Sequence, residues 1–365
     1  MKHGVIFRTT EGFFRYHAWP TVCQTEDGRL YAVCSGERAS HVCPFGKNLL
    51  FVSEDRGETW SLPMIVNDTW MDDRDAGICA LGNGKLLISY FHHPTSFYHK
   101  NIGWIEKCQP PREKNLSMCA FETYHEFTPS MDTKGSFIKK SSDSGKTWGT
   151  PIRVPVTSPH GPIKCSDGRL LWLGKEWHTD DPEHQDGILL AESRDDGETW
   201  KVLSQVPWPD GCIPKNFCEP DVLELPNGTL LGAIRAQGEE VYHKFTIYFC
   251  HSKDGGKSWD VPKCSMVSGS PPHLLLLSDH RILCSYSRRE VPFGIRAMIS
   301  EDGGETFGDE IEICRLTENQ TEGDFGYPST VELEDGTLLT VYYGTVDGDS
   351  EPSILYTKWN LNEIP

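Results

Sequence analysis

Short apolar runs alternate with polar turns along the whole of this 365-residue chain. In six places an apolar run leads into a two-residue turn and a second apolar run follows. Asp-Gly and Asn-Gly are the strongest short signals of a β-hairpin, because both residues tolerate the backbone that the turn requires. The pattern therefore predicts six β-hairpins. Their turns are Asp27-Gly28, Asn83-Gly84, Asp167-Gly168, Asn227-Gly228, Asp279-His280 and Asp335-Gly336.

A second motif, Ser-x-Asp-x-Gly-x-(Thr/Ser)-(Trp/Phe), follows each of the first five hairpins. Its Asp can accept hydrogen bonds from the backbone of a turn, its Gly can take a conformation that other residues avoid, and its aromatic residue can pack beneath. The motif predicts a second hairpin in each unit. Four antiparallel strands per unit are typical of the blade of a β-propeller. The copies begin at Ser53, Ser141, Ser193, Ser252 and Ser300.

These repeats predict an all-β chain, with residues 1–365 forming a single six-bladed β-propeller. The sixth unit stops after the strand-like residues 353–359 and has no copy of the second motif. We expect residues 2–8, which also have a strand-like pattern, to supply the missing strand and close the ring. The long second unit predicts an insertion at residues 94–134 in the second blade. A two-domain β-sandwich is the alternative fold.

The composition argues against several classes of partner. The net charge of −18 repels phosphate backbones and anionic lipid heads, so we expect neither nucleic acid nor a membrane as partner. No secretory signal and no apolar run of membrane-spanning length is evident. The 13 Cys residues include no Cys-x-x-Cys pair and no regular spacing, which favours a reducing, cytoplasmic location. We expect no metal and no other cofactor.

The starts of the innermost strands converge on the centre of a propeller, however far apart they are in sequence. Counting back from the hairpin turns aligns five residues at or near these starts: Trp19, Asp75, His160, Glu219 and Tyr327. Most are polar or ionisable where a strand core should be apolar. The mouth of a propeller is a concave place where several elements meet, so we expect a ligand site there. Solvation of the mouth is the alternative reason for polar residues.

Two longer segments point to a family. The residues CEPDVLELPNGTLLGAIR (218–235) and GYPSTVELEDGTLLTVYY (326–343) resemble segments of the sialidase (neuraminidase) superfamily of BNR, or Asp-box, repeat proteins. The resemblance covers essentially the whole chain. It implies a sialidase-type propeller that hydrolyses a terminal sialic acid, or a related acidic sugar, from glycans. It also implies Tyr327 as the nucleophile, Glu219 as its base and Arg235 as a ligand of the substrate carboxylate.

A tyrosine nucleophile suits such a substrate. Most retaining glycosidases use a carboxylate, and sialidases are an exception that use Tyr. Sialic acid carries a carboxylate on its anomeric carbon, which would repel an anionic nucleophile. A phenol that a neighbouring Glu activates presents an oxygen with less fixed charge.

The sequence departs from the sialidase pattern at two places. Sialidases hold the substrate carboxylate with three Arg. The first belongs to an Arg-Ile-Pro-like motif at the start of the first blade, where this chain reads Ala18-Trp19-Pro20; Arg15 lies slightly upstream. The third corresponds to one of Arg288, Arg289 and Arg296, of which we favour Arg289. The acidic Asp of the first blade is also missing, since the matching residues 36–47 contain no Asp.

Substitutes for both missing groups lie in adjacent segments. The segment 72–75 reads Asp-Asp-Arg-Asp, and the loop of the first blade carries Glu37, Arg38, His41 and Lys47. We expect Arg74 to replace the missing Arg and Asp73, Asp75 or His41 to donate the proton. Arg38, Trp19 and His160 complete the predicted substrate site. The alternatives are a solvated charged loop with a local ion pair at 72–75 and a surface or packing role for His41.

Two other functions remain open at this stage. One is a non-catalytic propeller that binds glycans, which the missing Asp and Arg would explain. The other is a lyase or glycosidase acting on glycans that contain uronic acid, with Tyr327 and either His160 or His41 as acid and base. Each reading makes an acidic carbohydrate the partner.

Overall fold

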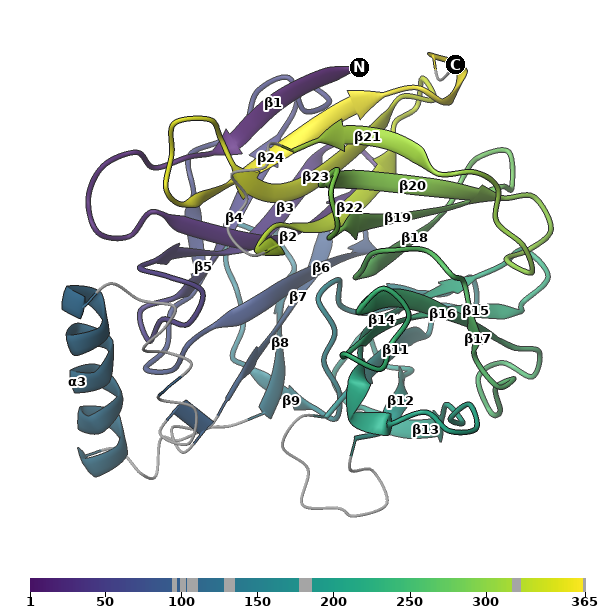
Figure 1. Ribbon diagram of the computed structural model, residues 1–365, viewed down its shortest axis with the longest axis horizontal. Helices are drawn as coiled ribbons and strands as arrows, with labels where there is room; N and C mark the ends of the chain where they lie inside the picture. Colours follow the sequence, from purple (N-terminus) through teal and green to yellow (C-terminus); the bar gives the residue numbers. More distant parts are fainter. Residues whose placement is uncertain are drawn as a thin grey trace.

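The computed structural model describes residues 1–93, 97–98, 103, 111–127, 135–176, 186–316 and 323–363. Six four-stranded antiparallel sheets surround a common centre (Figure 1). The inner strands of neighbouring sheets contact one another around the centre, and the innermost strand of the first sheet also contacts that of the last. The predicted six-bladed β-propeller is therefore confirmed.

The first three blades follow one another in chain order from the inner strand outward. The first blade contains β2 (Tyr16–Gln24), β3 (Leu30–Arg38), β4 (Lys47–Ser53) and β5 (Met64–Asn67). The second contains β6 (Arg74–Gly82), β7 (Lys85–His92), β8 (Gly135–Ser141) and β9 (Ile152–Val154). The third contains β10 (Ile163–Lys164), β11 (Leu170–Lys175), β12 (Ile188–Ser193) and β13 (Lys201–Gln205).

The remaining blades have the same order of strands. The fourth contains β14 (Phe217–Glu224), β15 (Leu230–Gln237), β16 (Phe245–Ser252) and β17 (Lys263–Cys264). The fifth contains β18 (Pro272–Leu276), β19 (Ile282–Arg288), β20 (Gly294–Ser300) and β21 (Ile311–Arg315). The sixth contains β22 (Gly326–Glu332), β23 (Leu338–Thr345), β24 (Pro352–Trp359) and β1 (Lys2–Phe7).

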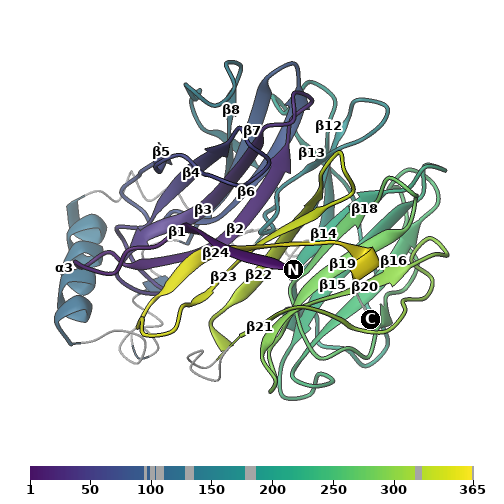
Figure 2. The same cartoon turned by 90° about the horizontal axis from the view of Figure 1, so that it is seen from above.

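The two ends of the chain meet in the sixth blade. The N-terminal strand β1 pairs antiparallel with β24, with Val5 opposite Leu355 (Figure 2). It occupies the outermost position of a sheet whose other three strands come from the C-terminal end. The hydrogen bonds of that sheet therefore join the first residues of the chain to the last strands.

The five repeated Ser-x-Asp motifs form the turns between the third and fourth strands of the first five blades. In the first copy, Asp55 accepts a hydrogen bond of 2.9 Å from the backbone of Thr59 and one of 2.6 Å from its hydroxyl group. These bonds lower the pKa of Asp55 to about 2. The Asp residues of the other copies make the same pair of bonds. The motif thus stabilises the blades and lies outside the innermost strands.

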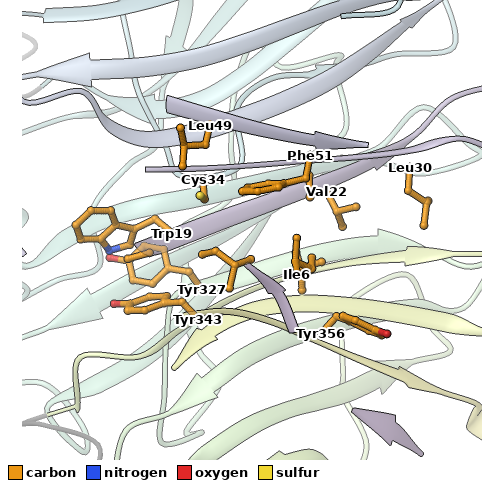
Figure 3. Packing of buried hydrophobic residues seen from close by; sticks show 14 of the residues in the cluster. Ile6, Trp19, Val22, Leu30, Cys34, Leu49, Phe51, Tyr327, Tyr343 and Tyr356 are labelled. Carbon is orange, nitrogen blue, oxygen red and sulfur yellow. The ribbon is translucent and has the colours of Figure 1, made fainter. Parts of the chain in front are cut away.

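Apolar side chains fill the spaces between neighbouring blades. The seam between the first and sixth blades contains Ile6, Val22, Phe51 and Tyr356, which are all buried (Figure 3). Each fully buried side chain of this size contributes about 1.5–3 kcal/mol to folding. Trp19, Tyr327 and Tyr343 belong to the same cluster and lie together at one end of it (Figure 3). The predicted site residues of two blades therefore rest on a rigid seam.

The helix α3 (Pro111–Phe127) lies at the periphery, next to the first blade (Figure 1). Its Phe121 ring stacks on Tyr98 with ring centroids 4.1 Å apart, and both pack against Val42. Val42 follows His41 in the loop of the first blade, so the helix supports that loop. Of the predicted insertion at 94–134, only residues 97–98, 103 and 111–127 are among the described residues.

Candidate active site

Four of the innermost strands carry the same backbone irregularity at their start. The pairing of β2, β6, β14 and β22 with the next strand shifts register at the same distance from the hairpin turn. Residues inside these bulges have φ of 53° at Trp19, 48° at Asp75, 45° at Glu219 and 52° at Tyr327. Positive φ is uncommon outside glycine, and bulges often re-aim a side chain beside an active site. The four bulged residues therefore lie at equivalent positions of their blades, in one layer around the centre.

Tyr327, Glu219 and Arg235 form one hydrogen-bonded group. The Tyr327 hydroxyl group donates to Glu219 Oε1 at 2.7 Å and accepts from Arg235 Nη1 at 2.9 Å. The same Nη1 also pairs with Glu219 Oε2. Tyr327 starts the sixth blade, whereas Glu219 and Arg235 belong to neighbouring strands of the fourth. The structure therefore brings together the three residues that the sialidase resemblance assigned to nucleophile, base and carboxylate ligand.

The environment keeps the Tyr327 phenol protonated. Burial raises its pKa well above the ordinary value of 10.0, and the nearby carboxylate of Glu219 raises it further, while Arg235 opposes the shift. A phenol with a raised pKa is a poor nucleophile unless a base takes its proton. Glu219 is in hydrogen-bond contact with that proton.

Arg289 is the fifth-blade arginine that reaches the group. Its guanidinium carbon lies 5.7 Å from the centroid of the Tyr327 ring, and its Nε donates to the carbonyl of Ser270 at 3.0 Å. Arg288 and Arg296 instead pair with Glu310, at 3.3 Å and 3.2 Å. Arg296 is almost completely buried. Of the three sequence candidates, the structure places Arg289 beside Tyr327.

Trp19 of the first blade and Arg74 of the second lie close to each other, and Trp19 lies near Tyr327. The rings of Trp19 and Tyr327 lie 6.5 Å apart, and the Arg74 guanidinium carbon lies 4.5 Å from the Trp19 ring. This distance is in the range of a cation–π interaction. Arg74 Nη1 also donates to the carbonyl of His41 at 2.8 Å and pairs with Asp72 at 3.3 Å. A cationic side chain from the second blade thus lies against Trp19 of the first.

Asp75 shares the bulged layer with Glu219 and Tyr327. Burial raises the pKa of its carboxyl group from 3.8 to about 7, and Glu219 adds to the rise while Arg74 opposes it. Asp75 Oδ1 is buried and has no hydrogen-bond partner among the described residues. A carboxyl group that keeps its proton near neutral pH has the property of a general acid.

His41 lies in the loop of the first blade, against Trp19. The two rings are nearly perpendicular, with centroids 5.0 Å apart. His41 Nδ1 lies 3.2 Å from Asp324 Oδ1, and Arg74 Nη2 lies 3.4 Å from His41 Nε2. Asp324 also accepts hydrogen bonds of 2.8 Å from both Tyr16 and Tyr343.

Asp324, Tyr16 and Tyr343 were missed by sequence reasoning. Tyr16 begins β2, just before Trp19, and Tyr343 lies opposite Gly326 at the end of β23. Asp324 stands in the chain shortly before Tyr327. A search for polar residues immediately upstream of each strand start, in addition to the start itself, would have found Asp324 and Tyr16.

The group around Tyr327 does not include three of the predicted site residues, which are Arg38, Asp73 and His160. Arg38 is 0% exposed and pairs with Asp72 at 2.7 Å, so the structure does not support direct substrate contact. Asp73 is also completely buried; it bonds to His92 and accepts 2.8 Å bonds from Thr69. Both residues support the loops around the site. Sequence position alone could not separate them from neighbouring residues such as Arg74, which lies against Trp19.

His160 belongs to a different layer of the channel. Its ring lies 4.8 Å from that of His273, and its Nδ1 is 3.4 Å from Thr21 Oγ1. Thr21 follows the bulge of the first blade, and the third blade shows no register shift at its start. Burial and His273 lower the pKa of His160 well below its ordinary value, so it is a neutral imidazole. The structure does not bring it into the group around Tyr327.

Comparison with known proteins identifies the family of the chain and the type of its propeller. Residues 121–340, more than half of the chain, match the family of BNR repeat-like domains. The chain belongs to this family. That result confirms the predicted membership of the Asp-box repeat proteins. No curated protein matches the sequence.

Solved structures show how widely this fold is shared. A protein of unknown function from Dyadobacter fermentans is 23% identical, with a TM-score of 0.74 over 98% of this chain and 97% of that one. The intramolecular trans-sialidase of Ruminococcus gnavus is 13% identical, with a TM-score of 0.68 over 99% and 98%. The Hadza microbial sialidase Hz136 is 16% identical, with a TM-score of 0.64 over 98% of this chain and 70% of that one. The propeller is therefore of the sialidase type.

The described residues contain no group of three or more His, Cys, Asp or Glu side chains arranged to hold a metal ion. All twelve cysteines in the described part of the chain are free thiols. No helix among the described residues has both the length and the apolar character needed to cross a membrane.

Proposed function

We propose that this protein is an exo-acting glycosidase that releases a terminal sialic acid, or a closely related acidic sugar, from glycans. The observation that carries the proposal is the 2.7 Å hydrogen bond from the Tyr327 hydroxyl group to Glu219, beside Arg235 and Arg289. A Tyr–Glu pair flanked by two arginines fits a substrate that carries a carboxylate next to its reacting carbon. Arg forms bidentate hydrogen bonds with carboxylates, which fixes the sugar in one orientation.

The reaction would begin with attack of the Tyr327 oxygen on the anomeric carbon. Glu219 would take the phenolic proton as the new bond forms, and Arg235 would hold both groups in place. A proton donor would protonate the glycosidic oxygen as its bond to the anomeric carbon breaks. Water would then attack the anomeric carbon and give a proton to the deprotonated donor, while Glu219 would return its proton to the phenolic oxygen as the bond to Tyr327 breaks. Two such displacements retain the anomeric configuration.

Asp75 and His41 are the two candidates for the proton donor. Asp73 is occupied by His92 and Thr69, as described above. Arg74 would take the place of the missing first arginine. Trp19 was predicted as a substrate ligand, but only 1% of it is exposed, so it would support Arg74 and Tyr327 by packing against them. No step of this mechanism requires a metal or a cofactor.

Hydrolysis of a fluorogenic aryl sialoside by the wild-type chain and by Tyr327→Phe tests the proposal. We expect turnover by the wild type and none above background by the variant, because only the phenolic oxygen is lost. Tyr356→Phe is the matched control, since Tyr356 lies in the same apolar cluster at its other end (Figure 3). Full activity of Tyr327→Phe would reject the mechanism.

A panel of acidic oligosaccharides should accompany the sialoside. Release of a free sugar from a uronic-acid glycan would move the substrate class but keep the hydrolase. An unsaturated product that absorbs in the ultraviolet would instead establish a lyase. Binding without any turnover would leave a glycan-binding propeller.

A further inference from the structure

We infer that His41 is the group that exchanges the proton with the leaving group, and that Asp324 is the positioning residue that holds His41 for this task. The inference rests on the proposed glycosidase and deepens it. It replaces the absent Asp of the first blade by a His–Asp pair that joins two blades. The first blade supplies His41, and the chain entering the sixth blade supplies Asp324.

The hydrogen bonds determine which nitrogen of His41 carries a proton at rest. Asp324 Oδ1 can only accept, so His41 Nδ1 donates to it across 3.2 Å. Arg74 Nη2, which can only donate, lies 3.4 Å from Nε2, so Nε2 is left as the acceptor. A carboxylate on one ring nitrogen orients the imidazole and leaves the other nitrogen for proton transfer.

Asp324 is built to remain a carboxylate. Burial opposes its ionisation, but the charge and hydrogen bond of His41, together with the hydroxyl groups of Tyr343 and Tyr16, lower its pKa to about 2. Tyr16 donates from β2 and Tyr343 from β23, so Asp324 has donors from two blades in addition to His41. These bonds fix the carboxylate in front of His41 Nδ1.

The other groups that face His41 come from three further elements. Arg74 of β6 approaches both the ring and the main-chain carbonyl, and Arg38 of β3 donates to the same carbonyl at 3.0 Å. Tyr16 of β2 lies 3.1 Å from Nδ1, and the Trp19 ring packs against the imidazole. The main chain of His41 is thereby held in place, and its ring lies between Asp324 on the Nδ1 side and Arg74 on the Nε2 side.

The position of His41 suits a proton donor better than that of Asp75. The nucleophile and the acid of a retaining glycosidase flank the scissile bond. Asp75 lies in the same bulged layer as Tyr327 and Glu219, and only 7% of it is exposed. The side chain of His41 comes from a loop and is 31% exposed, so it can reach a leaving group that departs into solvent.

The proton steps balance. In the first step, with Arg74 donating to the substrate carboxylate in place of His41 Nε2, the imidazolium form of His41 donates its Nε2 proton to the glycosidic oxygen while the bond to Tyr327 forms. In the second, neutral His41 removes a proton from the water that attacks the anomeric carbon, and the bond to Tyr327 breaks. Histidine is the side chain that exchanges protons most readily near neutral pH.

The resting state can be tested without any substrate, by ¹⁵N NMR of protein labelled at histidine. At slightly alkaline pH we expect His41 to show the Nδ1–H tautomer. His251 serves as the internal reference, because its Nε2 lies 2.9 Å from the carbonyl of Gly303 and should carry the proton instead. Asp324→Ala should abolish the tautomer preference of His41 and leave that of His251. An Nε2–H tautomer of His41 in the wild type would overturn the inference, whatever the activity.

Kinetics of Asp324→Asn then test the role in turnover. We expect kcat for a sialyllactose to fall about 10²-fold, in the range of general acid–base catalysis. An aryl sialoside needs little protonation of its leaving group, so its kcat should fall much less, and the alkaline limb of the pH–rate profile should move. Asp279→Asn removes a carboxylate at an exposed hairpin turn, where it pairs with Arg281, and should change neither value.

The two hypotheses fail differently. If neither sialoside is cleaved, the proposed glycosidase is wrong, and NMR still decides whether the His41–Asp324 pair exists. If both substrates are cleaved and Asp324→Asn matches the wild type on each, the role of Asp324 is wrong and the glycosidase stands. A selective loss with Asp75→Asn, in place of Asp324→Asn, would assign the proton to Asp75.

Discussion

The two halves of the candidate site differ in how closely they follow the sialidase resemblance. The half between the fourth and sixth blades contains Tyr327, Glu219 and Arg235, which are joined by short hydrogen bonds. In the half formed by the first and second blades, the Arg and the Asp of the family pattern are missing, and Arg74 and His41 lie near Trp19. In the proposed mechanism, the first half would carry the nucleophile and the second half would meet the leaving group. The resemblance is thus close where the sugar would be attacked and weak where the rest of the glycan would bind.

The largest expected effect is in the nucleophile half. Glu219→Gln removes the base that Tyr327 needs while keeping the size of the side chain. We expect kcat to fall by on the order of 10²-fold or more on every substrate. The loss should be the same for aryl and natural leaving groups, because protonation of the leaving group is untouched. Parallel kinetics on the two substrates check this. A loss confined to natural glycans would show that Glu219 also acts on the leaving group.

Arg74→Ala should give a smaller and different loss. A hydrogen bond to a charged group is worth about 1.5–3 kcal/mol, so we expect KM for a sialoside to rise roughly 10-fold to 100-fold. Tight binding of the free acidic sugar should weaken equally, which calorimetry would measure. A variant that loses kcat with unchanged KM would show that Arg74 serves His41 instead of the substrate.

Asp75→Asn tests whether the carboxyl group that shares the nucleophile layer is neutral. Its pKa in the folded protein is raised from 3.8 to about 7, so the folded state keeps a proton that the unfolded chain has released. The wild type therefore loses stability as the pH rises from about 4 to about 7. The Asn side chain does not titrate, so its stability relative to the wild type should improve by at least about 1 kcal/mol over that range. Urea unfolding at pH 5 and pH 8 measures the difference.

His160→Gln should have the smallest effect on turnover. His160 lies beside His273 and Thr21, away from the Tyr327 group. We expect kcat and KM to be unchanged, with some loss of stability from the altered packing at the centre of the ring. A marked change in KM would instead show that His160 takes part in substrate binding.

The repeat pattern was sufficient to predict the propeller, because each hairpin turn and each Asp motif reports on its own strands. Counting back from the turns also predicted that Trp19, Asp75, Glu219 and Tyr327 share one layer, since the four blades begin alike. The same counting misplaced His160, because the third blade lacks the register shift. Local patterns do not reveal such differences.

Contacts between blades were beyond the reach of the sequence. Arg38 was predicted to bind the substrate, but it is fully buried and forms an ion pair with Asp72, at the entrance to the second blade. Asp324 could be found only as a polar residue just before a strand start, because its role depends on Tyr16 and His41, which are close to it only in the folded ring. Burial and pairing between distant segments decide whether a charged residue binds a ligand or supports a loop.

Because the bulge with positive φ is repeated in four blades, different side chains can occupy equivalent backbone positions around the site. Because the backbone of the bulge is the same at Trp19, Asp75, Glu219 and Tyr327, a new residue at any of these points inherits a ready-made direction toward the centre. Evolution can therefore exchange one reactive group for another without rebuilding the blades. The first blade shows such freedom, since it carries an indole at a point equivalent to that of a carboxylate and a phenol. In a propeller of this kind, the side chain at each bulge can therefore differ while the backbone of the blade is kept.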